Sequence, residues 1–172
     1  MHSRTGSSET APTDLNKLIK EAVNLSFHSM KATEKPIDVE IEYDLDESVD
    51  EVPLIAEDFS RVFVNLCNNA FDAMREKKFD PNTKDYDPKL VVRSRKKGTN
   101  VVLEIEDNGS GISADIKEKV LQPFFTTKKG TEGTGLGLSI TNDIIKAHGG
   151  EISIESENGY TCFEMKIPAS TS

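Results

Sequence analysis

Hydrophobic residues recur along the chain with two different spacings, which predict helices and strands. A spacing of about 3.6 residues predicts three helices, over 15–31, 57–78 and 136–148. Asp14 would cap the start of the first helix, and Gly149 and Gly150 would end the last one. Strict alternation predicts strands over 37–44, 90–95, 101–107, 151–155 and 161–167, with a short apolar segment at 52–55. Residues 108–135 are mostly irregular, with a short helix expected near 113–121.

The alternating strands each have one polar and one apolar side. In the strand 37–44, for example, Val39, Ile41 and Tyr43 share the side expected to be buried. Such strands favour a mostly antiparallel sheet covered by helices on one face, so the predicted fold class is a two-layer α/β sandwich. A doubly wound sheet would need strands that are apolar on both faces. We expect one domain over 13–168, a linker over 1–12 and a tail over 169–172.

Composition narrows the possible partners. The 172 residues include 21 Lys+Arg and 30 Asp+Glu, and the resulting net charge of −9 argues against nucleic acid as the main partner. No apolar run approaches the roughly 18 residues that span a bilayer, so we expect no direct membrane contact, and the N-terminus lacks the apolar core of a signal peptide. Cys67 and Cys162 lie far apart in apolar segments, which suits a reducing compartment such as the cytoplasm.

The helix over 57–78 carries an unusual polar face. Asn65, Asn69 and Asp72 are spaced i, i+4 and i+7 and form one stripe. A solvated face is the ordinary interpretation, but Asn and Asp each cost roughly 0.5 kcal/mol against Ala in a helix. Amide and carboxylate oxygens instead suit a hard cation, or a ligand with both donors and acceptors.

A carboxylate is expected on the buried side of the strand 101–107. Asp107 continues the parity of Val101, Leu103 and Ile105, and Thr161 on a later strand also faces inward. Asp107 could bond to the backbone of the turn that follows, or it could accept from an exocyclic amine of a ligand. Together the two side chains could recognise the edge of a base, and the glycines at 109 and 111 would let the backbone approach a flat ligand.

A glycine-rich segment precedes the last helix. Backbone N–H groups and the positive end of a helix dipole make such a place an anion site, here with Gly130, Gly133, Gly135 and Gly137. Lys128 and Lys129 could add positive charge, unless they are an ordinary solvated pair, and Phe124 and Phe125 could clamp the loop onto the body. The combined features indicate a purine nucleotide with Mg²⁺. At the site, the attraction of the metal, the lysines and the helix dipole for the phosphates must outweigh the net negative charge of the chain.

Four segments resemble a known family. They are Asn65-Leu66-Cys67-Asn68-Asn69-Ala70, Asp107-Asn108-Gly109-Ser110-Gly111, Pro123-Phe124-Phe125-Thr126-Thr127-Lys128 and Gly133-Thr134-Gly135-Leu136-Gly137-Leu138-Ser139. Their order and spacing resemble the N, G1, F and G2 boxes of the catalytic, ATP-binding domain of sensor histidine kinases, within the GHKL ATPase superfamily. The resemblance covers about 13–168 and implies the Bergerat fold, an α/β sandwich.

The resemblance also implies roles for individual residues. Asn69 would coordinate Mg²⁺, Asn65 would support the phosphates, and Asp107 would accept from the adenine amino group near Thr161. Residues 113–135 would form the ATP lid, and Lys128 would reach the phosphates as a catalytic residue with Asn65 and Asn69. The implied nucleotide-binding set is Asn65, Asn69, Asp72, Ala73, Asp107, Gly109, Gly111, Ile112, Phe124, Thr126, Thr127, Lys128, Gly133, Thr134, Gly135, Leu136, Gly137, Leu138 and Thr161.

Two positions depart from patterns in this superfamily. Asp72 stands where familiar kinases have a basic residue, which resembles the heat-shock chaperone branch and suggests a water-mediated contact to the metal. Asn65 stands where the hydrolysing branches carry a glutamate base, and an amide cannot deprotonate water. Glu57 and Asp58 lie about two helical turns earlier, too far to replace it. Phosphoryl transfer to a side chain is therefore favoured over hydrolysis.

The sequence lacks an evident phosphoacceptor. His2 lies in the linker, His28 lies on the first helix, and His148 ends the last helix as a partner of its dipole. We therefore expect a catalytic portion of a larger kinase, with a separate helical phosphoacceptor and dimerisation domain and a response regulator as partners. A nucleotide-gated binding module and an anti-sigma-type serine kinase are the alternatives.

Overall fold

Five strands form the main sheet, in the order β2-β4-β5-β7-β6. The computed structural model describes residues 9–111, 135–157 and 159–169, and the side chains of 135–138 are outside that description. The strands are β2 (Glu40–Leu45), β4 (Lys89–Lys97), β5 (Asn100–Asp107), β6 (Glu151–Glu157) and β7 (Tyr160–Pro168). β2 pairs with β4 in parallel, and the other neighbouring pairs are antiparallel.

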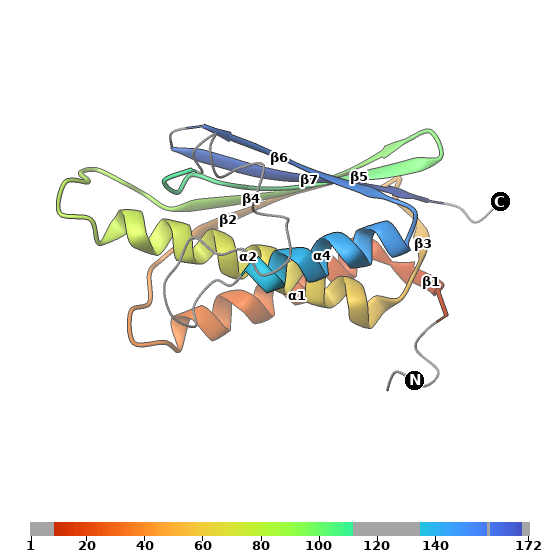
Figure 1. The fold of residues 1–172 in the computed structure, drawn as a ribbon, viewed down its shortest axis with the longest axis horizontal. Coiled ribbons are helices and arrows are strands. Elements are labelled where there is room, and N and C mark those ends of the chain that lie inside the picture. The colour runs from red at the N-terminus through yellow and green to blue at the C-terminus, as the bar shows by residue number, and fades with distance from the viewer. Residues whose placement is uncertain (1–8, 112–134, 158, 170–172) are drawn as a thin grey trace.

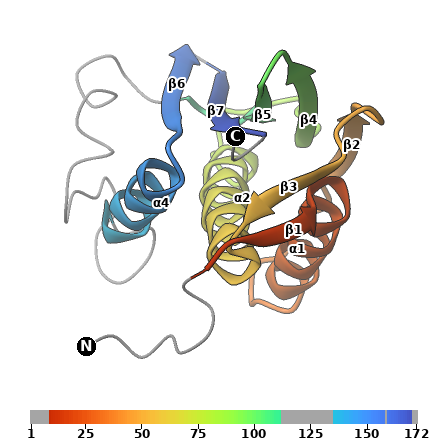
Figure 2. The same ribbon diagram turned by 90° about the vertical axis from the view of Figure 1, so that its right-hand side faces the viewer.

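In the part of the chain that the structure describes, helices cover one face of this sheet (Figures 1 and 2). They are α1 (Leu15–Lys31), α2 (Ala56–Lys78) and α4 (Gly135–Ala147). Asp14 caps α1 as predicted, because its side chain accepts from the backbone N–H of Lys17 at 3.1 Å. The predicted two-layer α/β sandwich is confirmed.

A second, two-stranded sheet lies beside α1 and was not predicted (Figure 2). It pairs β1 (Ala11–Asp14) antiparallel with β3 (Glu51–Leu54). Ala11 and Pro12 thus belong to a strand, although the sequence analysis counted them with the linker. Four mostly exposed residues carry no hydrophobic alternation of their own, so only the pairing with β3 defines this strand.

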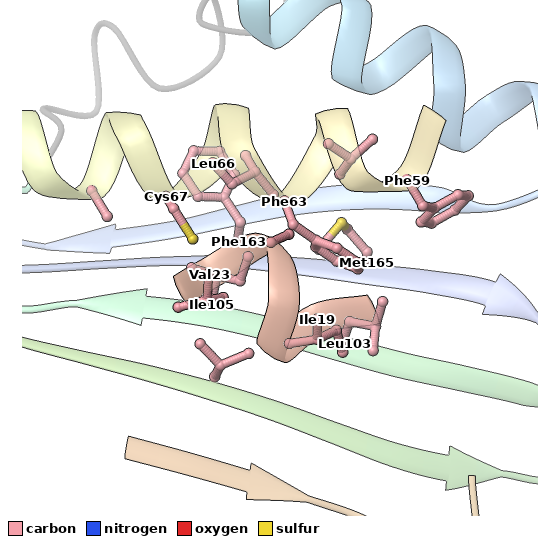
Figure 3. Packing of buried hydrophobic residues seen from close by; sticks show 14 of the residues in the cluster. Ile19, Val23, Phe59, Phe63, Leu66, Cys67, Leu103, Ile105, Phe163 and Met165 are labelled. Carbon is pink, nitrogen blue, oxygen red and sulfur yellow. The ribbon is translucent and has the colours of Figure 1, made fainter. Parts of the chain in front are cut away.

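The core lies between the sheet and the helices (Figure 3). Phe59, Phe63 and Leu66 of α2 are almost fully buried, and so are Leu103 and Met165 of the sheet, in the one cluster that Figure 3 shows. Burial of large apolar side chains on one face of each element supplies the main stabilisation of such a layer. The free thiols of Cys67 and Cys162 are also buried, and burial raises the pKa of each thiol to about 12.

The prediction for the first long strand was partly wrong. Val39 is buried, but Ile41 is only half-buried and Tyr43 is 37% exposed. β2 is an edge strand, so the helices cover its inner side less completely than they cover the central strands. In the described ranges, the molecule has no helix with the length and apolar character needed to cross a membrane.

Candidate functional site

Asp107 lies at the end of the central strand β5, with its side chain inside the sandwich. It is 3% exposed, and Thr161 of β7 is 4% exposed. The two residues are direct partners in the β5–β7 register, so their side chains stand next to each other on the same face of the sheet. Thr161 and Ser156 of β6 extend this polar row, with their hydroxyl oxygens 3.1 Å apart. The predicted inward placement of Asp107 and Thr161 is confirmed.

The carboxylate of Asp107 also shapes the turn that follows it. The backbone N–H of Gly109 donates to Oδ1 of Asp107 at 2.8 Å. The first interpretation of Asp107, that its carboxylate bonds to the backbone of the following turn, is therefore confirmed. It does not replace the ligand interpretation, because a carboxylate offers about four acceptor positions over its two oxygens.

The glycines at 109 and 111 are required by close packing. A Cβ on Gly109 would lie 2.9 Å from Cβ of Ala73 on α2, and a Cβ on Gly111 would lie 2.0 Å from the carbonyl oxygen of Glu157. Gly111 also has φ +81°, a conformation that side chains disfavour. The turn 107–111 is therefore held between α2 and the β6–β7 hairpin.

The asparagine face of α2 has the predicted stripe. Asn65, Asn69 and Asp72 are half-buried, whereas Asn68 is exposed. Oxygens of amides and carboxylates are suitable ligands for a hard cation such as Mg²⁺, so the donor chemistry of this stripe fits that metal.

Asp72 has an ionic partner that the sequence analysis missed. Nη1 of Arg75 lies 2.9 Å from Oδ1 of Asp72, and Nε of Arg75 donates to the carbonyl oxygen of Lys35 at 2.8 Å. The i, i+3 spacing of an acid and a base was the available signal in the sequence. The pair places a positive charge beside the stripe.

The start and end of α4 match the prediction. The helix begins at Gly135, so the predicted backbone N–H groups of Gly135 and Gly137 lie in its first turn. At its end, Nδ1 of His148 lies 2.8 Å from the carbonyl oxygen of Ile144, as expected for a partner of the helix terminus. Its Nε2 accepts from the backbone N–H of Ile55 at 3.2 Å, which joins α4 to the start of α2.

Several predicted residues lie outside the described ranges. The structure says nothing of the predicted lid, nor of the short helix expected near 113–121. The site residues concerned are Ile112, Phe124, Thr126, Thr127, Lys128, Gly133 and Thr134. The side chains of Leu136 and Leu138 are likewise not described.

Comparisons with known proteins agree with this arrangement. Residues 54–171 match the family described as histidine kinase-, DNA gyrase B- and HSP90-like ATPase. The sensor kinase CckA of Brucella abortus is 42% identical over 137 residues, which are 75% of this chain and 14% of CckA. The sensor protein FixL of Bradyrhizobium diazoefficiens is 34% identical over 166 residues, which are 95% of this chain and 30% of FixL. The chain thus spans less than a third of either relative.

Solved structures give a match over the whole domain. The catalytic domain of the histidine kinase ThkA superposes with a TM-score of 0.76 at 30% identity, covering 94% of this chain and 96% of that domain. ThkA has also been solved in complex with the response regulator protein TrrA, in a structure that is 26% identical to this chain. The chain therefore belongs to the histidine kinase-, DNA gyrase B- and HSP90-like ATPases, as a catalytic domain of the sensor histidine kinase type. As a member of this ATPase family it binds ATP.

Proposed function

We propose that the chain binds ATP with Mg²⁺ and delivers the γ-phosphoryl group to a histidine on a separate helical domain. The observation that carries the proposal is the buried Asp107 beside Thr161, at a turn whose glycines pack closely against Ala73 and Glu157. A carboxylate buried in this way is costly unless donors satisfy it, and the amino group of adenine is a suitable donor. Asp107 and Thr161 would recognise the base edge, while Ala73 and the turn would border the ring.

The asparagine stripe would serve the phosphate end of the nucleotide. Asn69 would hold Mg²⁺ and Asn65 would support the phosphates, and the bound metal would neutralise charge on the transferred group. Because position 65 is an amide, it cannot act as a general base toward water, which favours transfer over hydrolysis. Lys128 and the N–H groups at the start of α4 are proposed to complete the phosphate contacts.

The partners belong to the same proposal. The chain covers only part of its relatives, so the phosphoacceptor helix would come from another part of the same or a paired polypeptide. A response regulator would receive the phosphoryl group, by analogy with the complex of ThkA with TrrA. The buried free thiols suit a reducing cytoplasm. The names of the relatives do not favour a nucleotide-gated binding module or an anti-sigma-type serine kinase.

Calorimetric titration with ATP tests the nucleotide site. Asp107→Asn keeps an oxygen that can accept from Gly109 but removes the charge, so we expect a fold like the wild type and ATP affinity lowered about 100-fold or more. Asp46→Asn is the matched control, because Asp46 also accepts from a backbone N–H two residues on, at Ser48, and also loses one charge. Unchanged ATP affinity in Asp107→Asn would refute the adenine assignment.

Supplying the missing acceptor tests the reaction. The chain is mixed with ATP, Mg²⁺ and a helical hairpin domain of a sensor kinase that carries its histidine. We expect acid-labile phosphate on that domain. Acid-stable label on a protein serine would favour the serine kinase instead, and ATP binding without any transfer would favour the binding module.

A further inference from the structure

A lysine that the proposed function does not use joins the turn 107–111 to α2. Nζ of Lys77 donates to the backbone carbonyl oxygen of Asn108 at 3.3 Å and lies 4.5 Å from the centre of the Tyr86 ring. Lys77 is half-buried and stands four residues after Ala73, so the two residues share one face of the helix. Ala73 touches the turn at Gly109, and Lys77 holds the same turn one residue earlier.

The side chain of Asn108 is tied to a different part of the chain. Its Oδ1 accepts from the backbone N–H of Lys89 at 2.8 Å and from the hydroxyl of Tyr86 at 3.3 Å. Its Nδ2 donates to the carbonyl oxygen of Asp87 at 2.9 Å. All three partners lie where the segment that connects α2 to β4 meets the start of β4. The residue directly after Asp107 is therefore fixed by its side chain as well as by its backbone.

Tyr86 stands close enough to sense the charge of Asp107. Burial raises the pKa of the Tyr86 hydroxyl, and the negative charge of Asp107 raises that pKa further. The hydroxyl therefore stays protonated and able to donate to Asn108. Tyr86 thus contributes its ring to Lys77 and its hydroxyl to Asn108.

We propose that Lys77, with Tyr86 and Asn108, is a positioning residue that orients Asp107 for the exocyclic amine of a purine. The inference rests on the proposed function and adds to it a determinant of base selectivity. A hydrogen-bonding group recognises its ligand only when it is held to within about half an ångström, which requires a supporting layer of contacts. Lys77 supplies that layer from α2, the helix that also carries Asn69, so the base end and the metal end share one rigid element.

The preference of the chain for a nucleotide that carries the amino group tells whether Lys77 positions Asp107 or only stabilises the fold. Calorimetry compares ATP with purine riboside triphosphate, which has a hydrogen in place of that amino group. Lys77→Met keeps an unbranched apolar side chain but removes the ammonium, so we expect ATP affinity to fall about three- to tenfold. The analogue cannot use Asp107, so its affinity should change little and the preference for ATP should shrink.

Two variants serve as controls for the charge and the contact. Lys77→Arg retains a donor for the Asn108 carbonyl and a cation over Tyr86, so it should retain the preference for ATP. Lys84→Met removes the same charge at an exposed position of the neighbouring loop and should behave as the wild type.

Tyr86→Phe keeps the ring and deletes the hydroxyl, and we expect a smaller loss of the preference for ATP, in the same direction as in Lys77→Met.

Equal weakening of both nucleotides in Lys77→Met and Tyr86→Phe would overturn the inference, because a merely structural contact would affect them alike. Wild-type preference in both variants would overturn it as well. If Lys77→Met does not fold, Tyr86→Phe alone decides between these outcomes. A wild-type chain that binds the two nucleotides equally would instead contradict the proposed role of Asp107, so the two failures are distinguishable.

Discussion

The turn 107–111 and the asparagine stripe of α2 are two parts of one candidate site, and they are positioned by different kinds of contact. The turn depends on partners far away in sequence, since Gly109 meets Ala73, Gly111 meets Glu157, and Asn108 is held by the segment 86–89. The stripe follows from the helical repeat, which places Asn65 and Asn69 on one face of α2. The turn should therefore be more sensitive than the stripe to distant changes in packing.

Gly111→Ala tests the turn and should have the largest effect. A Cβ at this position would overlap the Glu157 carbonyl oxygen at 2.0 Å, and φ is +81°. We expect the free energy of unfolding to fall by about 3 kcal/mol, with loss of ATP binding. Chemical denaturation and calorimetry measure the two effects.

Gly98→Ala is the control for that variant. Gly98 has φ +64° with nothing within 4 Å of an added Cβ, so only the backbone conformation is penalised, by about 1 kcal/mol. ATP affinity should stay at the wild-type value. Equal destabilisation by the two substitutions would mean that the close approach at Gly111 contributes nothing.

Asn69→Ala tests the stripe and should separate binding from stability. Asn is a poor helix former, so the substitution should leave the free energy of unfolding unchanged or raise it by about 0.5 kcal/mol. ATP affinity should fall about tenfold when Mg²⁺ is present and much less when it is absent. Calorimetric titrations with and without Mg²⁺ measure the difference.

Asn68→Ala is the matched substitution for Asn69→Ala. It makes the same change one residue earlier, at an exposed position of the same helix, and should not alter ATP affinity. Equal losses with and without Mg²⁺ in Asn69→Ala would contradict the metal role of that residue.

Asp46→Asn should have the smallest effect. Asp46 accepts from a backbone N–H two residues on, as Asp107 does, but it lies outside the candidate site and serves the fold alone. The backbone N–H of Lys96, and then the hydroxyl and N–H of Ser48, lower the pKa of Asp46 from 3.8 to about 2. Because the folded pKa is the lower one, the charged carboxylate adds stability above about pH 4, and this contribution disappears as the pH falls toward about 2.

The Asp46→Asn variant should therefore lose less stability than the wild type between about pH 5 and about pH 2.5. Denaturation midpoints at the two pH values measure this difference. A pH dependence identical to that of the wild type would show that the contacts of Asp46 do not favour its charged form.

The sequence alone determined the local features of the protein. Periodicity predicted α1, α2 and α4, alternation predicted the strands of the main sheet, and parity placed Asp107 and Thr161 inside. These features depend on neighbours within one or two turns of the chain, so a linear pattern records them. The four motifs likewise indicated the family, because they are contiguous in sequence.

The tertiary structure decided what depends on distant partners. β1 exists because β3 pairs with it, and Tyr43 is exposed because β2 is an edge strand. The contact of Lys77 with Asn108 joins residues 31 positions apart, and no periodic pattern marks such a pair in advance. Hydrogen bonds of this kind form only after chain folding brings their partners together, so they could be found only in the folded molecule.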